Sequence, residues 1–253
     1  MHGNAIQEIF NRLPGVYERI NHIISLGLDV LWRRKAASLA SAKGGAMWLD
    51  VSTGTGEMAA QLRRLAGTGT TVVATDFSLP MLLQARRKKE AASATEAAPK
   101  ARKNPGILFA AADTGCLPFR PGSFDLVTIS FATRNITTSK ENLISCLAEF
   151  HRVLKPGGWL VNLETSQPDS PIVRRLFHGY VDGFLKPVAA AISGSKSAYS
   201  YLSSTIRSFY DADELAEIMR QAGFGTVSVV RLFAGTAAIH KAEKATSSKA
   251  LRE

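Results

Sequence analysis

Cysteine is scarce in this 253-residue sequence, which contains only Cys116 and Cys146. Two thiols are too few for a disulfide scaffold, so the sequence predicts a reducing, cytoplasmic environment. Long apolar runs are also missing: none approaches the ~20 residues of a membrane span, and the first residues lack the basic and apolar regions of a secretory signal. Cysteine and histidine nowhere recur at metal-binding spacings. We therefore expect a cytoplasmic protein, soluble or associated with a membrane surface, with no metal site.

Acidic residues are fewer than basic ones, 21 against 31, and the net charge is +10. Much of the excess lies in residues 86–104, which begin with Arg86, Arg87, Lys88 and Lys89 and continue without apolar periodicity. This composition predicts a basic, flexible surface insertion. A solvated loop explains it most simply. Contact with an anionic membrane surface is the functional alternative, ahead of nucleic-acid binding.

Glycines cluster in residues 49–57 (Leu-Asp-Val-Ser-Thr-Gly-Thr-Gly-Glu), between an apolar strand at 47–51 and a helix that starts near Met58. A strand, a glycine-rich turn and a helix in this order hold a nucleotide-like ligand at the carboxyl end of a parallel strand. Gly54 and Gly56 allow the backbone to approach such a ligand closely, although a tight turn without a ligand has the same pattern. The next strand, 70–75, ends in Asp76, about 20 residues past the loop, where a ribose diol is bound. Together the two features favour a nucleotide-like ligand.

Strands and helices alternate through the rest of the chain. Apolar runs that suit a sheet covered on both faces predict strands at 107–111, 124–131 and 159–163, and a closing antiparallel hairpin is expected at 227–233 and 236–240. The predicted fold is α/β, a doubly wound, mostly parallel seven-stranded sheet. We expect one domain, residues 1–240, with N-terminal helices at 4–42, a helical cap at 168–208 and a disordered tail at 241–253. Asp29 is the expected N-cap of the last N-terminal helix.

The glycine loop lacks the third glycine of dinucleotide-binding proteins, and its Asp-x-x-x-Gly-x-Gly pattern with a strand-end Asp76 resembles class I methyltransferases that use S-adenosylmethionine. More specific motifs are Tyr-Glu-Arg-Ile-Asn at 17–21, Asp-Phe-Ser at 76–78, Leu-Pro-Phe at 117–119, Arg-Asn at 134–135, Leu-Glu-x-Ser-x-Pro at 163–168 and Ala-Gly-Phe at 222–224. With these motifs the chain, over residues 10–240, resembles the family of menaquinone and ubiquinone biosynthesis C-methyltransferases.

The resemblance implies that the protein transfers a methyl group from S-adenosylmethionine to a ring carbon of a prenylated hydroquinone. It also implies a role for each matching residue. Gly54, Thr55 and Gly56 would line the methionine and ribose side of the cofactor, Asp76 would bind the ribose hydroxyls, Asp113 and Thr114 would contact the adenine, Ser130 would close the site, and Arg134 and Asn135 would face the quinol. Two departures from the family pattern are Glu57, where aspartate is usual, and Thr133, where an apolar residue is expected.

An aromatic carbon is a poor nucleophile unless a ring hydroxyl is ionised, so a group that favours the phenolate matters. Arg134 keeps its proton and can stabilise a phenolate, and Asn135 can hold a ring hydroxyl by a hydrogen bond. The alternative is that Arg134 pairs with a structural carboxylate. Glu164 and Tyr17 are the candidate proton acceptors, whereas none of the five histidines stands at the end of an expected parallel strand.

Other functions are compatible with parts of the sequence. A nucleic-acid methyltransferase would suit the positive charge, yet the fourth strand ends in Ser-Phe-Ala-Thr (130–133) rather than the Asn/Asp-Pro-Pro-aromatic signature of base amino-group methylation, so we expect no nucleic-acid partner. A non-catalytic binding protein would not need Asp76, Asp113 and the glycine loop. A methyltransferase of another aromatic or lipid-like acceptor is the nearest rival, since fold does not fix substrate. The sequence leaves open the ring class, the prenyl length and whether the chain forms a homodimer.

Overall fold

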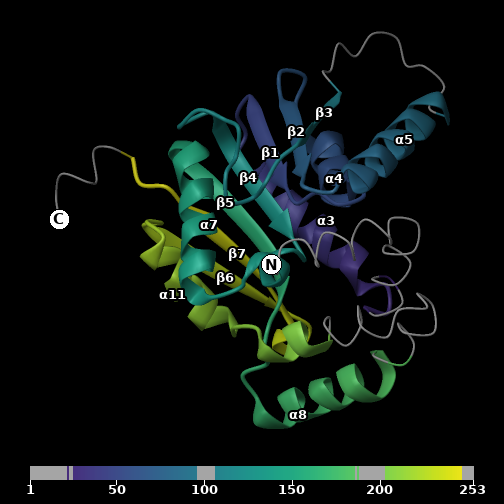
Figure 1. Ribbon diagram of the computed structural model, residues 1–253, viewed down its shortest axis with the longest axis vertical. Coiled ribbons are helices and arrows are strands. Elements are labelled where there is room, and N and C mark those ends of the chain that lie inside the picture. Colours follow the sequence, from purple (N-terminus) through teal and green to yellow (C-terminus); the bar gives the residue numbers. More distant parts are fainter. Residues whose placement is uncertain (1–21, 23–24, 96–105, 186, 188–202, 247–253) are drawn as a thin grey trace.

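The computed structural model describes residues 22, 25–95, 106–185, 187 and 203–246. In that part of the chain, seven strands form one sheet in the order β3-β2-β1-β4-β5-β7-β6, in which only the β5–β7 and β7–β6 pairs are antiparallel. The strands are β1 (Met47–Val51), β2 (Thr71–Asp76), β3 (Ile107–Ala111), β4 (Phe124–Ser130), β5 (Leu154–Thr165), β6 (Thr226–Leu232) and β7 (Ala237–Glu243). The predicted doubly wound, mostly parallel sheet is confirmed, including its closing hairpin (Figure 1).

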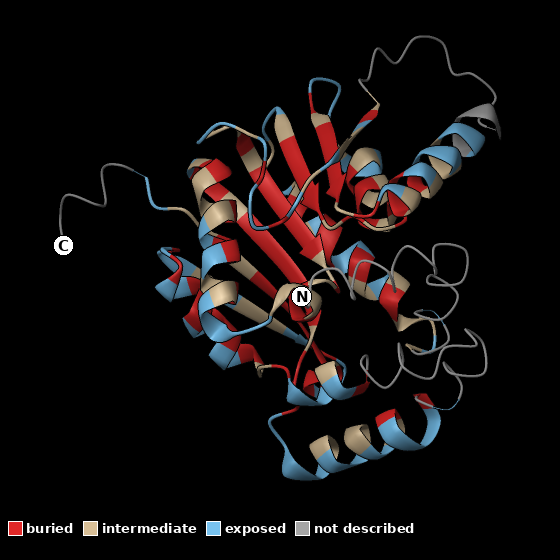
Figure 2. Ribbon diagram, viewed as in Figure 1, coloured by how far each residue is buried: buried red, intermediate tan, exposed pale blue. Residues whose placement is uncertain are grey.

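Helices cover both faces of the sheet (Figure 1). Successive residues of the central strands pack against opposite layers. Leu49 and Val127 belong to a cluster with α7 (Lys140–Val153) and α11 (Ala212–Gln221), whereas Trp48 and Leu126 belong to one with α3 (Leu28–Ser41) and α4 (Glu57–Leu65). Because both faces are buried, these strands are continuous apolar runs in the sequence. Figure 2 shows the buried residues concentrated along the strands and on the inward sides of the helices.

The remaining helical segments follow the carboxyl ends of strands. They are α5 (Leu79–Thr95) after β2, α6 (Thr133–Ile136) after β4, α8 (Pro171–Tyr180) and the π-helical turn η1 (Val181–Leu185) after β5, and the 3₁₀ turn η2 (Phe233–Gly235) after β6. The carboxyl ends of β1 to β6 lie at one end of the sheet, which we call the carboxyl edge. Within the described residues, no helix is both long enough and apolar enough to cross a membrane.

Three predicted boundaries differ from the structure. The N-cap of α3 is Gly27, with φ of 78°, rather than Asp29, which is buried in the first helical turn because its carboxylate pairs with Arg33. The insertion predicted to be flexible from residue 86 is helical as far as Thr95, since its alanine, arginine and lysine residues favour a helix. The tail predicted from residue 241 falls partly inside β7, which continues to Glu243 because it pairs with β5 on one side and β6 on the other.

Other predicted segments lie partly outside the described residues. Of the N-terminal helices expected at 4–42, the structure describes α3 in full. Of the cap expected at 168–208, it describes α8, η1 and a helical stretch at 203–208. Val181, Leu185 and Ile206 form a small buried cluster that joins the two parts of this cap. The described residues of this range are therefore mostly helical, and their role as a cap stays a prediction.

Candidate active site at the carboxyl edge of the sheet

The turn after β1 adopts left-handed backbone angles. Ser52, Gly54 and Gly56 have φ of 51°, 56° and 84°, and the Gly56 N–H donates to the Thr53 carbonyl at 3.0 Å. A Cβ added at Gly56 would lie 3.0 Å from the Cβ of Ala85, so close helix packing requires glycine there. A Cβ at Gly54 would meet no atom within 4 Å. Open space therefore lies beside Gly54, where a ligand can approach the backbone.

Asp76, at the end of β2, faces this turn. Its Oδ2 accepts the Gly54 N–H at 2.8 Å, and its Oδ1 accepts the Ser78 N–H at 2.9 Å. The side chain is only 5% exposed, and burial raises its pKa above the usual aspartate value, although the backbone N–H groups of Ser78 and Gly54 oppose the shift. A buried carboxylate beside open space suits a ribose diol, whose two hydroxyls donate hydrogen bonds. The geometry fits the adenosyl group of S-adenosylmethionine.

The loop after β3 brings Thr114 to the same place. Its hydroxyl lies 3.0 Å from the Ser52 hydroxyl, within hydrogen-bonding distance. Asp113 is exposed, and its Oδ1 accepts the N–H of Gly115 at 2.8 Å. The structure thus places Thr114 against the glycine turn and the Asp113 carboxylate at the surface next to it.

Two further predicted cofactor residues flank the turn. Thr55 is buried between the two glycines. Ser130 is half-buried at the end of β4, the strand that pairs with β1 on the side away from β2. The predicted cofactor residues therefore come from four neighbouring segments that converge on one part of the carboxyl edge.

Sequence reasoning missed the role of Asp50, which lies on β1 beneath the glycine turn. It is fully buried and accepts the hydroxyls of Thr53 at 2.6 Å and Thr128 at 2.7 Å. Burial raises the pKa of Asp50 to about 6, against the lowering effect of those hydrogen bonds and of the Arg33 charge. The signal in the sequence that could have indicated this role is an acidic residue inside an otherwise apolar strand. Through these two hydrogen bonds, Asp50 links the glycine turn to β4.

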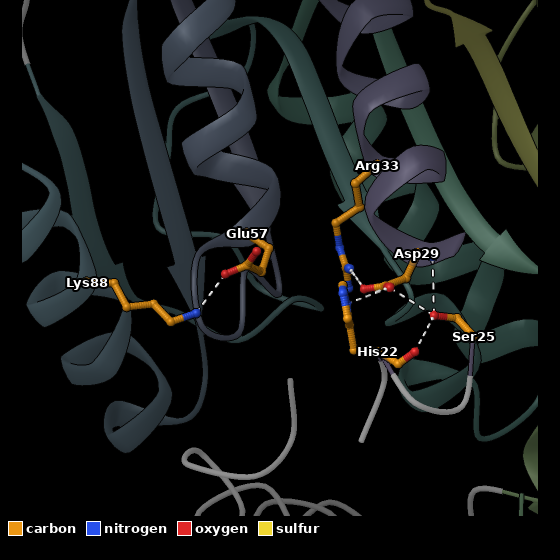
Figure 3. Close-up of polar contacts among 6 residues, drawn as sticks. All are labelled: His22, Ser25, Asp29, Arg33, Glu57 and Lys88. Atoms are coloured by element: carbon orange, nitrogen blue, oxygen red, sulfur yellow. Dashed lines mark hydrogen bonds and ion pairs between the residues drawn. The ribbon is translucent and has the colours of Figure 1, made fainter. Parts of the chain in front are cut away.

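A polar cluster at the start of α3 was also missed. Asp29 accepts Arg33 Nη1 at 2.5 Å and the Ser25 hydroxyl at 2.8 Å, and it lies 3.0 Å from His22 Nδ1 (Figure 3). The Arg33 guanidinium is in turn 5.0 Å from the ring centroid of Phe131, which follows β4 with φ of 54°. Since α3 leads into β1, its first turn lies at the carboxyl edge. The cluster therefore lies at the same edge of the sheet as the glycine turn.

Glu57, one of the two departures from the family pattern, is the first residue of α4. Its Oε1 accepts Lys88 Nζ of α5 at 2.6 Å (Figure 3). Lys88 belongs to the segment predicted as a basic insertion, so part of that charge is used within the protein. The ion pair links α4 and α5 next to the glycine turn.

Arg134 and Glu164 form a buried ion pair between α6 and β5, joining Arg134 Nη1 to Glu164 Oε1. Glu164 also accepts the backbone N–H of Arg134 at 3.2 Å and the N–H and hydroxyl of Thr165. The side chains are 4% and 1% exposed. The sequence left open that Arg134 pairs with a carboxylate, and the structure shows this pairing. The partner is Glu164, which the sequence also suggested as a proton acceptor.

The other residues considered for the side of the methyl acceptor differ in where the structure places them. Asn135 is half-buried in α6, next to Arg134. Thr133 is fully buried and its hydroxyl bonds to Asn162 Oδ1 of β5, so it points into the core rather than toward a substrate. Tyr17 lies outside the described residues. The structure thus brings Arg134, Asn135 and Glu164 together at the carboxyl ends of β4 and β5. Strand β4 pairs directly with β1, and β5 is the next strand in the sheet.

The strand order, the antiparallel β7, the glycine turn and the strand-end Asp76 together define a class I methyltransferase that uses S-adenosylmethionine. Comparison with solved structures shows the same fold. A "SAM-dependent methyltransferase, possible histamine N-methyltransferase" from Thermotoga maritima superposes with a TM-score of 0.64 at 18% identity, covering 94% of this chain and 99% of that one. A phosphoethanolamine N-methyltransferase of Haemonchus contortus in complex with S-adenosyl-L-methionine has a TM-score of 0.52 at 15% identity, covering 80% and 49%. Identities this low show a shared fold alone.

The chain belongs to the ubiE/COQ5 methyltransferase family, whose model matches residues 1–244. It is 36% identical over 236 residues to a demethylmenaquinone methyltransferase of Beutenbergia cavernae, covering 93% of this chain and 89% of that protein. It is also 36% identical over 237 residues to a ubiquinone/menaquinone biosynthesis C-methyltransferase of Acidiphilium cryptum, covering 94% and 89%. The cofactor is S-adenosylmethionine.

Proposed function

We propose that this protein transfers the methyl group of S-adenosylmethionine to a ring carbon of a prenylated hydroquinone, in the biosynthesis of a respiratory quinone. The relatives of similar length named for demethylmenaquinone methylation support this reaction. The observation that carries the proposal is the buried Arg134–Glu164 pair at the ends of β4 and β5. Strand β4 lies next to β1, which leads into the glycine turn. In this proposal, the pair would hold the Arg134 guanidinium in a fixed orientation near the expected methyl donor.

The cofactor side would be held by the glycine turn, by Asp76 at the ribose, and by Thr114 and Ser130 at its two sides. When bound, S-adenosylmethionine supplies a methyl group already activated by a sulfonium. The protein's task is then to hold the two reactants in line and to exclude water. Gly54 leaves the space for close approach, and Asp76 fixes the adenosyl end.

On the acceptor side, Arg134 stabilises the ring phenolate by its charge. Because Glu164 holds the guanidinium by its Oε1, the orientation of the Arg134 side chain is fixed before the phenolate charge develops. Asn135 holds a ring hydroxyl. The Glu164 carboxylate, bonded to Arg134 and Thr165, positions the arginine. The hydroxyl proton passes to another acceptor, for which Tyr17 is the candidate. After the ring carbon has taken the methyl group, its own hydrogen moves as a proton to the ring oxygen, which restores the aromatic hydroquinone.

The direct test is an assay of the purified protein with labelled S-adenosylmethionine and two acceptors, a demethylated prenyl naphthoquinol and the corresponding benzoquinol. We expect label on a ring carbon of one of them, with release of S-adenosylhomocysteine. Tight cofactor binding without transfer to either quinol, but with transfer to another aromatic or lipid-like acceptor, would overturn the quinol assignment and leave the methyltransferase class intact.

A variant pair tests the role of Arg134. Arg134→Ala should lower kcat and leave the S-adenosylmethionine Kd unchanged, and Arg134→Lys should restore part of kcat because it keeps the charge. Since removing one partner of a buried pair costs about 3–5 kcal/mol of stability, turnover is compared at a temperature where both variants are shown to be folded. Wild-type turnover by Arg134→Ala would show that the pair is structural only.

A further inference from the structure

Helix α8 exposes large apolar side chains on its outer face. Ile172 and Leu176, one helical turn apart, are 73% and 70% exposed, and no residue of α8 is buried. Two aliphatic side chains at i and i+4 form a continuous strip, because residues at this spacing lie on the same side of a helix. Arg175 is exposed beside them, and the helix contains no aspartate or glutamate. The outer face is thus apolar with a positive charge.

The opposite face of α8 is fixed to the protein by polar contacts. Arg174 Nε donates to the Pro168 carbonyl at 2.9 Å, and His178 Nε2 lies 2.8 Å from Gln167 Oε1. Phe177 and Tyr180 pack against the small buried cluster of Val181, Leu185 and Ile206. The helix is therefore anchored with its apolar strip outward, which reverses the usual orientation of a surface helix.

Most other exposed apolar side chains lie at the same end of the molecule. Phe233, in the η2 turn after β6, is 64% exposed and Phe184 follows α8 in η1. The η2 turn contacts the segment that leads into α8, since a Cβ at Gly235 would lie 3.2 Å from the Pro168 Cα. Exposed leucines also occur just before α3 and near the N-termini of α3 and α5, which lie at the carboxyl edge. They are Leu26, Leu31, Leu79 and Leu83. Figure 1 shows α8 outside the sheet, beyond its carboxyl edge.

We propose that α8, with Phe233 beside it, is an interfacial helix that binds the protein to an anionic lipid bilayer, with Ile172 and Leu176 inserted among the acyl chains. The choice of a bilayer rests on the proposed function, because a prenylated quinol resides in lipid. Charge supports it: Arg175 lies within the strip, no carboxylate lies on α8, and the chain carries +10 overall. Helices of this kind bind by buried apolar area together with attraction to anionic headgroups.

The position of α8 explains how a membrane-bound substrate would reach the site. Glu164 lies near the end of β5, and α8 begins at Pro171, a few residues further along the chain. The bilayer would therefore meet the protein at the edge where the Arg134–Glu164 pair lies. A prenyl tail can stay in lipid while its ring enters from the surface.

Binding to vesicles tests this inference without reference to catalysis. The full-length protein is mixed with vesicles of phosphatidylcholine and phosphatidylglycerol, or of phosphatidylcholine alone, and separated by flotation. We expect binding to the anionic vesicles that weakens with salt. The double variant Ile172→Ser/Leu176→Ser should lose at least tenfold in binding, and Arg175→Glu should weaken binding to anionic vesicles only.

The matched control is Leu65→Ser/Leu108→Ser, which removes two exposed leucines away from the carboxyl edge and should bind vesicles as the wild type does. Turnover of a short-tailed, water-soluble quinol should be the same in both double variants. Equal vesicle binding by Ile172→Ser/Leu176→Ser and wild type would overturn the inference. The inference would also be overturned if the wild type is a dimer that does not bind vesicles and the variant is a monomer. That result would make the strip a contact between two copies of the chain. Vesicle binding by a protein that methylates no quinol would leave the inference standing and defeat the proposed function.

Discussion

The backbone N–H of Gly54 donates to Asp76 Oδ2 at 2.8 Å, joining two landmarks 22 residues apart in the sequence. The glycine turn and the strand-end carboxylate are thus joined directly to each other. The carboxylate is held in place by the same backbone that approaches the cofactor. A change to either residue should therefore alter cofactor binding.

Asp76→Ala should raise the Kd of S-adenosylmethionine at least tenfold, which is about 1.4 kcal/mol. The variant loses the acceptor for the ribose hydroxyls and the partner of the Gly54 N–H. Isothermal calorimetry measures the change. Asp125→Ala is the control, because Asp125 accepts the N–H groups of Ala46 and Met47 at the opposite end of the sheet. An unchanged Kd in Asp76→Ala would remove the ribose assignment.

Alanine at the two glycines of the turn should have different effects. Both positions have positive φ, so each substitution costs about 1–2 kcal/mol of stability. Gly56→Ala should cost more, since its Cβ would lie 3.0 Å from that of Ala85, whereas Gly54→Ala meets no protein atom. Gly54→Ala should instead fill the space beside Asp76 and weaken cofactor binding. Urea unfolding and calorimetry separate the two effects, and equal losses of stability would contradict this packing.

Asp50 should make stability depend on pH. Its pKa is about 6 in the folded protein and about 3.9 when unfolded. As pH rises between these values, the unfolded chain releases a proton that the folded chain keeps, so the free energy of unfolding falls by roughly 3 kcal/mol. Asp50→Asn cannot titrate. The stability of wild type minus that of the variant, from urea unfolding between about pH 4 and 7, should fall across this window, and parallel profiles would disprove the shift.

Thr133→Val should destabilise the protein by about 1–3 kcal/mol, because it leaves Asn162 Oδ1 buried without the Thr133 hydroxyl. The S-adenosylmethionine Kd should not change, since Thr133 points into the core. Thr226→Val, at an exposed position of β6, is the control and should change stability by no more than about 0.5 kcal/mol. A stable Thr133→Val with altered substrate preference would place the residue in the pocket wall instead.

The parts predicted correctly from the sequence rest on local signals. Apolar runs mark the strands because both faces of the sheet are buried. The spacing of the glycine turn and Asp76 predicts that they lie at one edge of the sheet, and the structure joins them by a hydrogen bond, whereas their contact with the cofactor stays a prediction. The antiparallel hairpin of β6 and β7 was also visible, although not its placement with β7 between β5 and β6.

The parts that were missed depend on contacts between distant residues. Arg134 and Glu164 are 30 positions apart, and only the pairing of β4 with β5 brings them together. Asp29 is the local exception: it looks like an N-cap by residue type, but its pairing with Arg33, four positions further along, places it inside the helix. Thr133 could face either the pocket or the core, and the hydroxyl partner on β5 decides for the core. A single sequence carries no direct signal for such pairs.

The antiparallel direction of β7 has a practical consequence. The strand starts beside Thr165 at the carboxyl edge and ends at Glu243 beside Trp159, at the other end of the sheet. A coupling group placed just beyond Glu243 would attach the protein to a sensor chip with its ligand-binding end facing the flowing solution. Cofactor and vesicles could then be injected over the same immobilised sample, and their responses compared without obstruction by the chip.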